Sequence, residues 1–344
     1  VEQLLIRADA DTQIGTGHLM RCLALSQNWI AKGRAVTMIT CCKSESLRKR
    51  LSAEGIQVIR MENPHPNPQD WEITSQALRK HSGAWVVLDG YHFDPEYQSR
   101  IKNAGHRLLV VDDTAHLEHY YADILLNQNL YAEKLKYSCQ TPARRLFGTQ
   151  YVLLRSEFLA WRGWKRELPE VAHKILVTLG GSDPTNATLK IIESIKATNI
   201  FDLEVKIVAG ASNPHMDKLQ SSIQSTRCKM SILYNVVNMP ELMSWADLAV
   251  AAGGITCWEM AFMKLPFASV VLANNQSTIS NAVERAGIAV SFGWHNQLDR
   301  LLLAKRLVLL IRDKSARAAM SAKGATLVDG LGADRTIKAM EAEK

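Results

Sequence analysis

The sequence lacks the features that would place it outside ordinary globular proteins of a reducing compartment. Its six cysteines include no C-x-x-C pair and no regular spacing, which argues against a disulfide scaffold and against a zinc site. No apolar run is long enough to cross a bilayer, and no basic segment followed by an apolar one precedes the first predicted strand. We therefore expect reduced thiols, no membrane insertion and a cytoplasmic protein.

Blocks of like charge and internal repeats are also missing. The net charge of +7 is spread along the 344 residues, which suits an anionic small molecule better than a nucleic acid. The short clusters Arg48-Lys49-Arg50 and Arg144-Arg145 have no interleaved aromatic residues, so we interpret them as solvated faces. The expected partner is a small anionic substrate.

Apolar strand candidates alternate with amphipathic helical segments in both halves of the chain, as is typical of parallel βαβ units. The first half offers strands at 4–6, 36–40, 56–60, 85–89, 107–112 and 123–126, and the second at 174–179, 203–209, 229–233, 248–252 and 267–272. Between them, residues 158–173 are charged and lose strand periodicity. We predict an α/β chain with a Rossmann-like domain at 1–157, a linker at 158–173, a second Rossmann-like domain at 174–344, and a ligand cleft between the domains.

The stretch Ile14 to Arg21 has the composition of a ligand-binding turn between a strand and a helix. Gly15 and Gly17 allow backbone N–H groups to approach an anion at a helix start, with Thr16 between them. His18 and Arg21 are three residues apart and share a helix face. We interpret His18 as a base and Arg21 as a cation held over one substrate; the alternative is a glycine-rich turn with a surface histidine.

Two further strand-to-helix turns in the second half carry glycine pairs, Gly180-Gly181-Ser182 and Gly253-Gly254-Ile255-Thr256. Their free N–H groups suit a diphosphate, and Asp183 followed by Pro184 is expected to open the helix after the first of them. Glu259 lies one turn into the second predicted helix, where a carboxylate can accept both hydroxyls of a ribose. Asn238 and Met239 complete the candidate UDP-binding residues. The alternative is two tight turns in an ordinary α/β sheet.

Several other polar residues follow predicted strands. Asp9-Ala10-Asp11 and Asp112-Asp113 have metal-binding spacing, but they lie far in the sequence from the phosphate signals, so we expect them to cap turns or bind sugar hydroxyls and expect no metal. The candidate substrate-binding residues outside the glycine turn are Arg21, Asp9, Tyr91, Asn275 and Gln276.

The chain resembles the PseG family, the UDP-2,4-diacetamido-2,4,6-trideoxy-β-L-altropyranose hydrolases of pseudaminic acid synthesis. The motifs that carry the resemblance run in order along the chain: Arg7 to Asp11, Ile14 to Leu23, Leu88-Asp89-Gly90-Tyr91, Val111-Asp112-Asp113, Leu126-Asn127-Gln128-Asn129, Gly148 to Arg155, Gly180 to Asn186, Met243 to Ala249, Ala252 to Glu259 and Asn274-Asn275-Gln276.

This resemblance implies a GT-B fold similar to that of the glycosyltransferase MurG, with UDP on the second domain and the sugar facing the first. It also implies hydrolysis at the anomeric C1–O bond without a metal or other cofactor, with His18 matching the family's catalytic histidine. One departure is visible, because Ile255 stands where family members often have Ser or Thr, which leaves Thr256 to supply a hydroxyl. Direct attack by water would invert C1. The alternatives are a glycosyltransferase on the same fold and a UDP-sugar-binding protein without catalysis; no oligomer is required.

Overall fold

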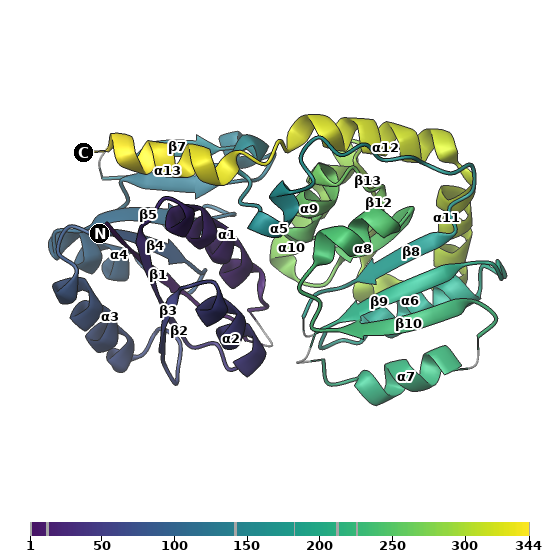
Figure 1. Ribbon diagram of the computed structural model, residues 1–344, viewed down its shortest axis with the longest axis horizontal. Coiled ribbons are helices and arrows are strands. Elements are labelled where there is room, and N and C mark those ends of the chain that lie inside the picture. Colours follow the sequence, from purple (N-terminus) through teal and green to yellow (C-terminus); the bar gives the residue numbers. More distant parts are fainter. Residues whose placement is uncertain are drawn as a thin grey trace. The chain divides into compact units, whose positions relative to one another are not determined.

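The computed structural model describes residues 2–11, 14–140, 143–181, 183–210, 213–224 and 226–343. The chain divides into two compact units, the first made of residues 1–156 and 330–344 and the second of residues 157–329. Each unit is a parallel sheet with flanking helices, so the predicted α/β class with two parallel-sheet domains is confirmed (Figure 1).

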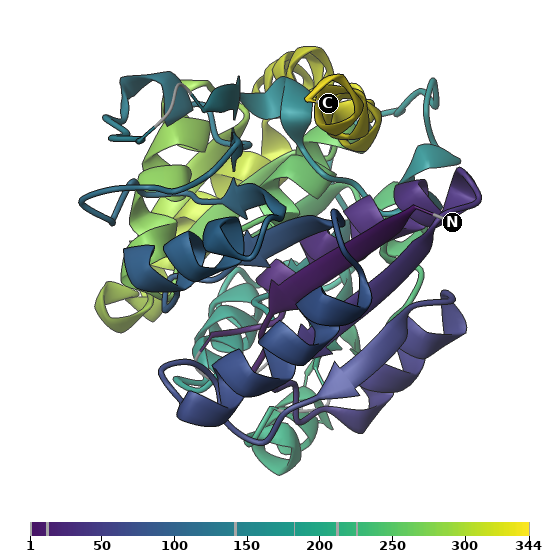
Figure 2. The same cartoon turned by 90° about the vertical axis from the view of Figure 1, so that its left-hand side faces the viewer.

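The first unit is built on a seven-stranded parallel sheet with the strand order β3-β2-β1-β4-β5-β6-β7. Its strands are β1 (Gln3–Ala8), β2 (Ala35–Thr40), β3 (Gln57–Arg60), β4 (Trp85–Asp89), β5 (Arg107–Val111), β6 (Ile124–Asn127) and β7 (Arg144–Phe147), and its helices are α1 (Gly17–Ala31), α2 (Glu45–Ala53), α3 (Pro68–Lys80), α4 (Pro95–Asn103) and α13 (Gly332–Ala342). Figure 2, which looks onto this unit, shows helices on both sides of the sheet.

Alternation along β1 explains why both faces of this sheet are covered. Leu4 and Ile6 belong to a core shared with α1 and α13, whereas Leu5 belongs to a second core shared with α3 and α4. All three side chains are buried, as expected for a central parallel strand. The flanking helices begin at local signals, for example Asp94, whose side chain caps Tyr97 N at the start of α4 with Pro95 as its first residue.

The second unit has a six-stranded parallel sheet with the order β10-β9-β8-β11-β12-β13. Its strands are β8 (Lys174–Thr178), β9 (Glu204–Ala209), β10 (Lys229–Tyr234), β11 (Leu248–Ala252), β12 (Phe267–Val271) and β13 (Ala289–Trp294), and its helices are α6 (Ala187–Lys196), α7 (Met216–Gln224), α8 (Met239–Trp245), α9 (Thr256–Phe262), α10 (Asn274–Arg285), α11 (Arg300–Arg312) and α12 (Lys314–Leu327). The short helix α5 (Ser156–Leu159) spans the boundary between the units.

Both sheets reverse their strand order once, between β1 and β4 in the first unit and between β8 and β11 in the second. Ligands of open α/β sheets bind outside the carboxyl ends of the strands at such a reversal. The Gly15–His18 turn follows β1, and the two glycine pairs follow β8 and β11. The topology therefore places the predicted turns at the two reversal points.

The structure differs from the expected domain limits at residues 330–344. These residues were expected in the second domain, but α13 lies against α1 and belongs to the first unit. The reason is apolar periodicity, because Ala333, Ile337 and Met340 recur on one helix face and are buried in the core beside β1. Residues 330–344 thus complete the core of the first unit.

The expected linker at 158–173 lies within the second unit rather than between two units. Arg166 anchors it, because its guanidinium donates to the backbone carbonyls of Met263 (3.1 Å), Ala246 (2.5 Å) and Met243 (2.5 Å). Loss of strand periodicity does not distinguish a free linker from a segment that is held by side-chain bonds to backbone.

Two strands and one helix start also differ from expectation. The strands β7 and β13 were not predicted, since β7 is short and begins with Arg144-Arg145, and β12 and β13 pair with a register shift at Ser269/Val270. The helix after Gly181 begins at Ala187 rather than at Pro184, because Asp183 and Asn186 adopt positive φ angles of 36° and 53°. Asp183 still accepts hydrogen bonds from Ala187 N and Thr188 N.

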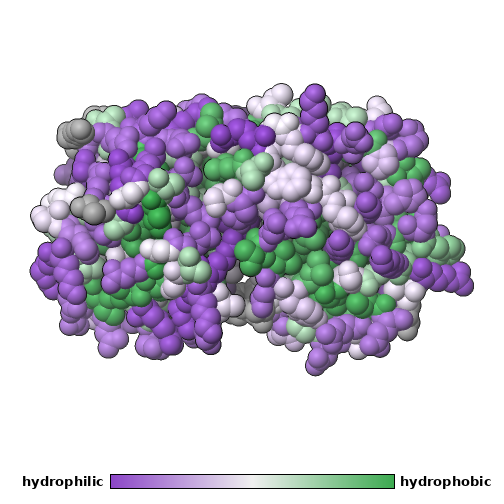
Figure 3. Space-filling model, viewed as in Figure 1, coloured by the Kyte–Doolittle hydropathy of each residue, from purple (hydrophilic) through white to green (hydrophobic). Residues whose placement is uncertain are grey.

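The six cysteines are all free, as the sequence predicted. Within the described part of the chain, no helix is both long and apolar enough to span a bilayer. The face seen in Figure 3 is largely hydrophilic, with hydrophobic residues in scattered patches.

The packing of α13 leads to a testable expectation for Ile337→Ala. Removing this fully buried side chain costs about 2–5 kcal/mol by cavity formation. Hydrogen exchange measured by mass spectrometry is expected to quicken in peptides of the first unit, in particular those of α1 and β1, and to stay unchanged in peptides of 157–329. The exposed Lys338→Ala is the matched control on the same helix. Faster exchange in the second unit alone would contradict this assignment.

Candidate functional site

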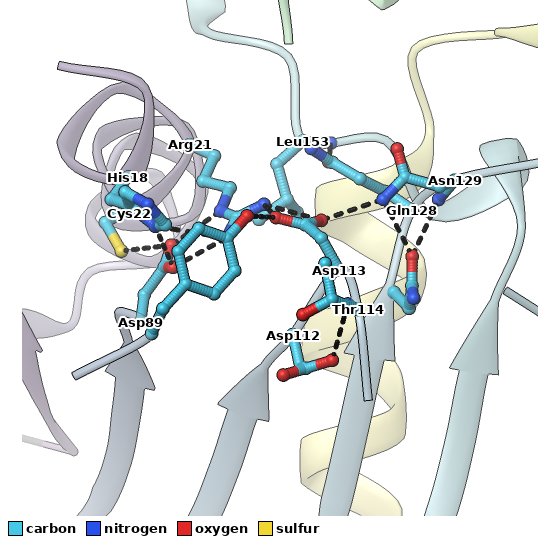
Figure 4. Close-up of polar contacts among 12 residues, drawn as sticks. His18, Arg21, Cys22, Asp89, Asp112, Asp113, Thr114, Gln128, Asn129 and Leu153 are labelled. Atoms are coloured by element: carbon cyan, nitrogen blue, oxygen red, sulfur yellow. Dashed lines mark hydrogen bonds and ion pairs between the residues drawn. The ribbon is translucent and has the colours of Figure 1, made fainter. Parts of the chain in front are cut away.

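The candidate site in the first unit is a cluster of polar side chains at the carboxyl ends of neighbouring strands. His18 and Arg21 come from the first turns of α1, Asp89 ends β4, Asp113 follows β5, and Asn129 follows β6. Figure 4 shows these groups directed toward one another across the strand ends. All five residues are at most 7% exposed, so the cluster is a desolvated network rather than a set of surface groups.

His18 is held by Asp89 through a 2.6 Å contact between Nδ1 and Oδ1. The Arg21 Nη2 atom also lies 3.2 Å from His18 Nδ1, but a carboxylate only accepts and is much closer, so Nδ1 carries a proton. In the neutral imidazole this leaves the lone pair on Nε2. A histidine oriented by a carboxylate in this way can act as a general base through Nε2.

Arg21 joins the two carboxylates of the cluster. Its Nε and Nη2 donate to the two oxygens of Asp89 at 2.6 and 2.7 Å, and its Nη1 donates to Asp113 at 2.8 and 3.0 Å. Burial alone would raise the pKa of Asp89, but the Arg21 charge and the hydrogen bonds from Arg21 and His18 hold that pKa well below its usual range. Asp89 is therefore ionised near neutral pH.

Tyr91 and Asn129 complete the surroundings of Asp113. The Tyr91 hydroxyl donates to Asp113 Oδ2 at 2.7 Å, and Asn129 Nδ2 donates to Asp113 Oδ1 at 2.8 Å. The ring of Tyr91 stands edge-on to His18, with 5.0 Å between the ring centroids. Tyr91 therefore packs against the imidazole of His18 while its hydroxyl is bonded to Asp113.

The glycine turn before His18 has the geometry expected of an anion-binding turn. Gly15 has a φ of +78°, and its N–H bonds to the carbonyl of Asp11 at 3.0 Å. Thr16 stands at the N-cap position of α1 without a side-chain cap, Gly17 is the first helical residue, and the first turn holds no acidic residue. The start of this 15-residue helix therefore has a backbone geometry and a composition that suit an anion.

Asp9 lies in a different network from His18. Its Oδ1 accepts from Arg7 (2.5 Å) and from Cys41 N (2.7 Å), and its Oδ2 is 2.9 Å from His92 Nε2. Both oxygens of this buried carboxylate are engaged, so Asp9 anchors the strand ends of β1 and β2. No group of three or more His, Cys, Asp or Glu among the described residues is arranged to hold a metal ion.

The predicted residues of the second unit gather at the carboxyl ends of its central strands. Gly180 and Gly181 follow β8, Gly253 and Gly254 follow β11, and Asn275 and Gln276 begin α10 after β12. The backbone of Gly210 packs closely on that of Gly181, because a Cβ at Gly210 would lie 2.1 Å from the Gly181 carbonyl oxygen. The remaining candidates have these places: Asn238 and Met239 at the start of α8, Thr256 as the first residue of α9 and Glu259 one turn further. Ser182 lies outside the described residues.

Two of these side chains have geometry that bears on a ligand. Glu259 is only 7% exposed on α9, close behind the Gly253-Gly254 turn. Gln276 accepts from Leu272 N at 3.0 Å through its Oε1, which fixes its amide at the end of β12. A carboxylate held near a glycine turn suits a ribose, and the free amide N–H groups of Gln276 suit a carbonyl or hydroxyl.

The sequence interpretation missed the roles of Asp89, Asp113 and Asn129. A signal was present, because each follows a buried strand and lies in a motif that carries the family resemblance. Asp112 is a turn cap, as expected, since Oδ1 accepts from Thr114 N and Ala115 N at 2.8 and 2.6 Å.

The Arg21 bridge leads to a pH-dependent expectation for Arg21→Met. In the native protein the depressed pKa of Asp89 stabilises the fold above the ordinary carboxyl pKa, and this contribution is lost as pH falls through the native pKa. Without the guanidinium Asp89 loses the charge that holds its pKa down and Asp113 loses its bonds to a cation, so the variant is less stable by about 3–5 kcal/mol near neutral pH. We expect this deficit to shrink from about pH 8 to about pH 5, as measured by urea unfolding.

The matched control is Arg60→Met, which removes an exposed pair with Glu62 at 3.3 Å and costs at most about 1 kcal/mol. A deficit for Arg21→Met that grows toward acid pH would show that Asp89 and Asp113 are not the groups left unpaired.

Comparison with known proteins supports the fold and the resemblance. Residues 174–331 match the glycosyltransferase family 28 C-terminal domain. The solved structure of Acinetobacter baumannii MurG has a TM-score of 0.67 and 13% identity, covering 99% of this chain and 100% of that one. A structure of S. aureus MnaA with UDP has a TM-score of 0.67 and 13% identity, covering 99% of this chain and 96% of that one. These neighbours show the GT-B type of fold that the sequence resemblance implied.

Three sequence relatives cover most of the chain. The UDP-2,4-diacetamido-2,4,6-trideoxy-beta-L-altropyranose hydrolase of Campylobacter jejuni is 24% identical over 84% of this chain and 99% of its own length. The spore coat polysaccharide biosynthesis protein SpsG of Bacillus subtilis is 23% identical over 98% of this chain and 97% of its own length. An uncharacterized protein of Methanocaldococcus jannaschii is 26% identical over 80% of this chain, and the match spans just 56% of that longer protein. Residues 174–331 are thus similar to the glycosyltransferase family 28 C-terminal domain, in a chain that resembles the UDP-2,4-diacetamido-2,4,6-trideoxy-β-L-altropyranose hydrolases along most of its length.

Proposed function

We propose that the chain hydrolyses UDP-2,4-diacetamido-2,4,6-trideoxy-β-L-altropyranose to UDP and 2,4-diacetamido-2,4,6-trideoxy-L-altrose. His18 Nε2 takes a proton from water, and the water oxygen attacks C1 while the bond between C1 and the diphosphate oxygen breaks. The electron pair of that bond leaves with UDP, and C1 is inverted because attack and departure occur on opposite faces. The free sugar would serve pseudaminic acid synthesis and so the modification of flagellin or another surface glycan.

The observation that carries this proposal is the 2.6 Å bond between His18 Nδ1 and Asp89 at the strand-order reversal of the first sheet. It directs the basic nitrogen of His18 away from the network that fixes the ring. Tyr91 packs against His18 and Arg21 bonds to Asp89, so both side chains of this hydrogen bond are limited in their movement. Positioned general bases of this kind contribute about a hundredfold to ten-thousandfold to hydrolytic rates.

The second unit would bind the UDP part. Backbone N–H groups of the two glycine turns would hold the diphosphate, and Glu259 would accept the ribose hydroxyls. A diphosphate held by such donors is a stabilised leaving group that needs no strong acid, and we propose a reaction without a metal ion. We place the reaction in the cytoplasm, where nucleotide sugars are made.

A glycosyltransferase is the second candidate, and the family 28 match of residues 174–331 favours it. The two chemistries differ only in the nucleophile at C1, an acceptor hydroxyl instead of water. A UDP-sugar-binding protein without catalysis is the third, and the intact pair of His18 and Asp89 argues against it.

The first test is UDP release from the UDP-linked sugar with a chelator present and no acceptor, comparing the native chain with His18→Asn and Asp89→Asn. We expect turnover by the native chain and a loss of about a hundredfold or more in each variant, since one lacks the base and the other lacks the group that fixes its tautomer. UDP binding, measured by calorimetry, is expected to be unchanged in both.

His81→Asn, a change far from this network at the end of α3, is the matched control and should leave turnover at the native level. UDP release that requires an acceptor would decide for the transferase, and binding without any turnover would decide for the binding protein. Equal turnover by native and His18→Asn would exclude His18 as the base.

A separate test concerns Glu259. The change Glu259→Gln removes a charged acceptor for the ribose hydroxyls, and we expect the Kd for UDP to rise by about tenfold, as for the loss of one charge-assisted hydrogen bond. Calorimetric titration with UDP measures this, and the exposed Glu170→Gln in the same unit is the control. The Kd for uracil is expected to stay the same in both variants. An unchanged Kd for UDP would remove Glu259 from the binding site.

A further inference from the structure

His116 connects the loop after β5 to the loop that carries Tyr91, although neither sequence pattern nor comparison points to it. Its Nδ1 lies 2.8 Å from Asp112 Oδ2, and its Nε2 lies 3.0 Å from the backbone carbonyl oxygen of Tyr91. Its ring also stands edge-on to that of Tyr91, with 5.6 Å between the centroids. The imidazole thus spans two loops with one nitrogen on each.

Both partners of His116 can only accept a hydrogen bond. A carboxylate and a backbone carbonyl have no proton to give, so each ring nitrogen must carry one. A neutral imidazole has a single N–H and satisfies only one of the two partners. The geometry therefore requires the doubly protonated imidazolium at His116.

Tyr91 contacts both His116 and His18, the proposed base, so the position of His116 affects that of His18. Its ring edge packs on His18 and its hydroxyl is bonded to Asp113, so a shift of the Tyr91 backbone changes the support of His18 and of the Arg21 network together. We propose that protonated His116 is a positioning residue, which holds the Tyr91 backbone and through it sets His18 in its working orientation. This inference rests on the proposed hydrolase function for its effect on turnover, but not for its effect on structure.

The charges around His116 favour its protonated form. Asp112 and Asp113 belong to its own loop, Tyr91 faces it from the loop after β4, and Thr114 Oγ1 is 3.5 Å from Nδ1. The cation of Arg21 is paired with Asp89 and Asp113, and Tyr120 and Tyr137 donate their hydroxyls to Asp112. The hydrogen bond to Asp112 raises the pKa of His116 above its usual value, and burial opposes this less strongly.

Loss of the proton would release Tyr91 rather than Asp112. A neutral imidazole keeps the stronger bond, which is the one to the charged carboxylate, and then turns the bare lone pair of Nε2 toward the Tyr91 carbonyl oxygen. The hold on Tyr91 is therefore complete below the pKa of His116 and is lost as pH rises through it. The proton goes to solvent. Turnover is expected to fall as pH rises through the pKa of His116, because the neutral imidazole no longer holds the Tyr91 backbone.

The structural part is tested by long-range proton–nitrogen NMR spectra of the full chain without substrate. We expect both ring nitrogens of His116 to be protonated at about pH 7, because the partner of each nitrogen can only accept a hydrogen bond. The ring protons of Tyr91 should shift with the same midpoint as His116. A singly protonated His116 at this pH would overturn the proposal whether or not the chain is a hydrolase.

The kinetic part uses two variants that each restore one donor. The amide nitrogen of His116→Gln reaches about as far as Nε2 and can bond Tyr91, whereas that of His116→Asn reaches about as far as Nδ1 and can bond only Asp112. We expect His116→Gln to keep kcat within about threefold of native and to lose the fall in turnover at alkaline pH. We expect His116→Asn to have a kcat about tenfold lower at all pH values, which is the ratio for one lost hydrogen bond. KM for the UDP-sugar should be unchanged, since UDP is held elsewhere.

His119→Gln is the matched control, because His119 lies three residues away and contacts Ser138 Oγ rather than Tyr91. It should keep the native pH profile. Equal kcat for the Gln and Asn variants, or an alkaline decline that survives in His116→Gln, would overturn the positioning role. If the native chain releases no UDP, the proposed function fails while the NMR titration still decides the contact between His116 and Tyr91.

Discussion

The guanidinium of Arg21 is the group on which the candidate site depends. It lies between Asp89 and Asp113 at distances of 2.6–3.0 Å and is 2% exposed, so two buried carboxylates and one buried cation form a compact charged core. Burial by itself would raise the pKa of Asp89, and the charge and hydrogen bonds of Arg21, together with His18, lower it and keep this carboxylate ionised. The ionised Asp89 in turn fixes the protonated nitrogen of His18. The orientation of the His18 ring is thus set by a buried ion pair.

The site is a product of the sheet topology as much as of its residues. Four strands in a row end in polar side chains or lead to them: β1 leads to His18, β4 to Asp89, β5 to Asp113 and β6 to Asn129. Parallel strands bring their carboxyl ends to one edge, so residues 16 to 92 positions apart in the sequence become hydrogen-bonded neighbours. A network of this kind positions its members precisely, because moving one residue would leave others buried without partners.

Only part of the site could be predicted from the sequence. The spacing of His18 and Arg21 on one helix face is a local property, and their helix does begin at Gly17. The pairing of Arg21 with Asp89 and Asp113 depends on which strands are neighbours, and strand order is not encoded in local periodicity. For the same reason the sequence did not show that Asp9, a candidate substrate-binding residue, bonds to Arg7, Cys41 and His92 in a network separate from that of His18.

The sequence by itself determined the α/β class, the number of parallel-sheet domains, the positions of most strands and the glycine turns, because these follow from apolar periodicity and from the conformational freedom of glycine. The tertiary structure decided where the chain divides, which strands lie side by side and what each charged group contacts. Residues 330–344 show the difference, since the periodicity of α13 predicts a helix with one apolar face. It does not say which core has room for that face, and only the packing against α1 placed it in the first unit.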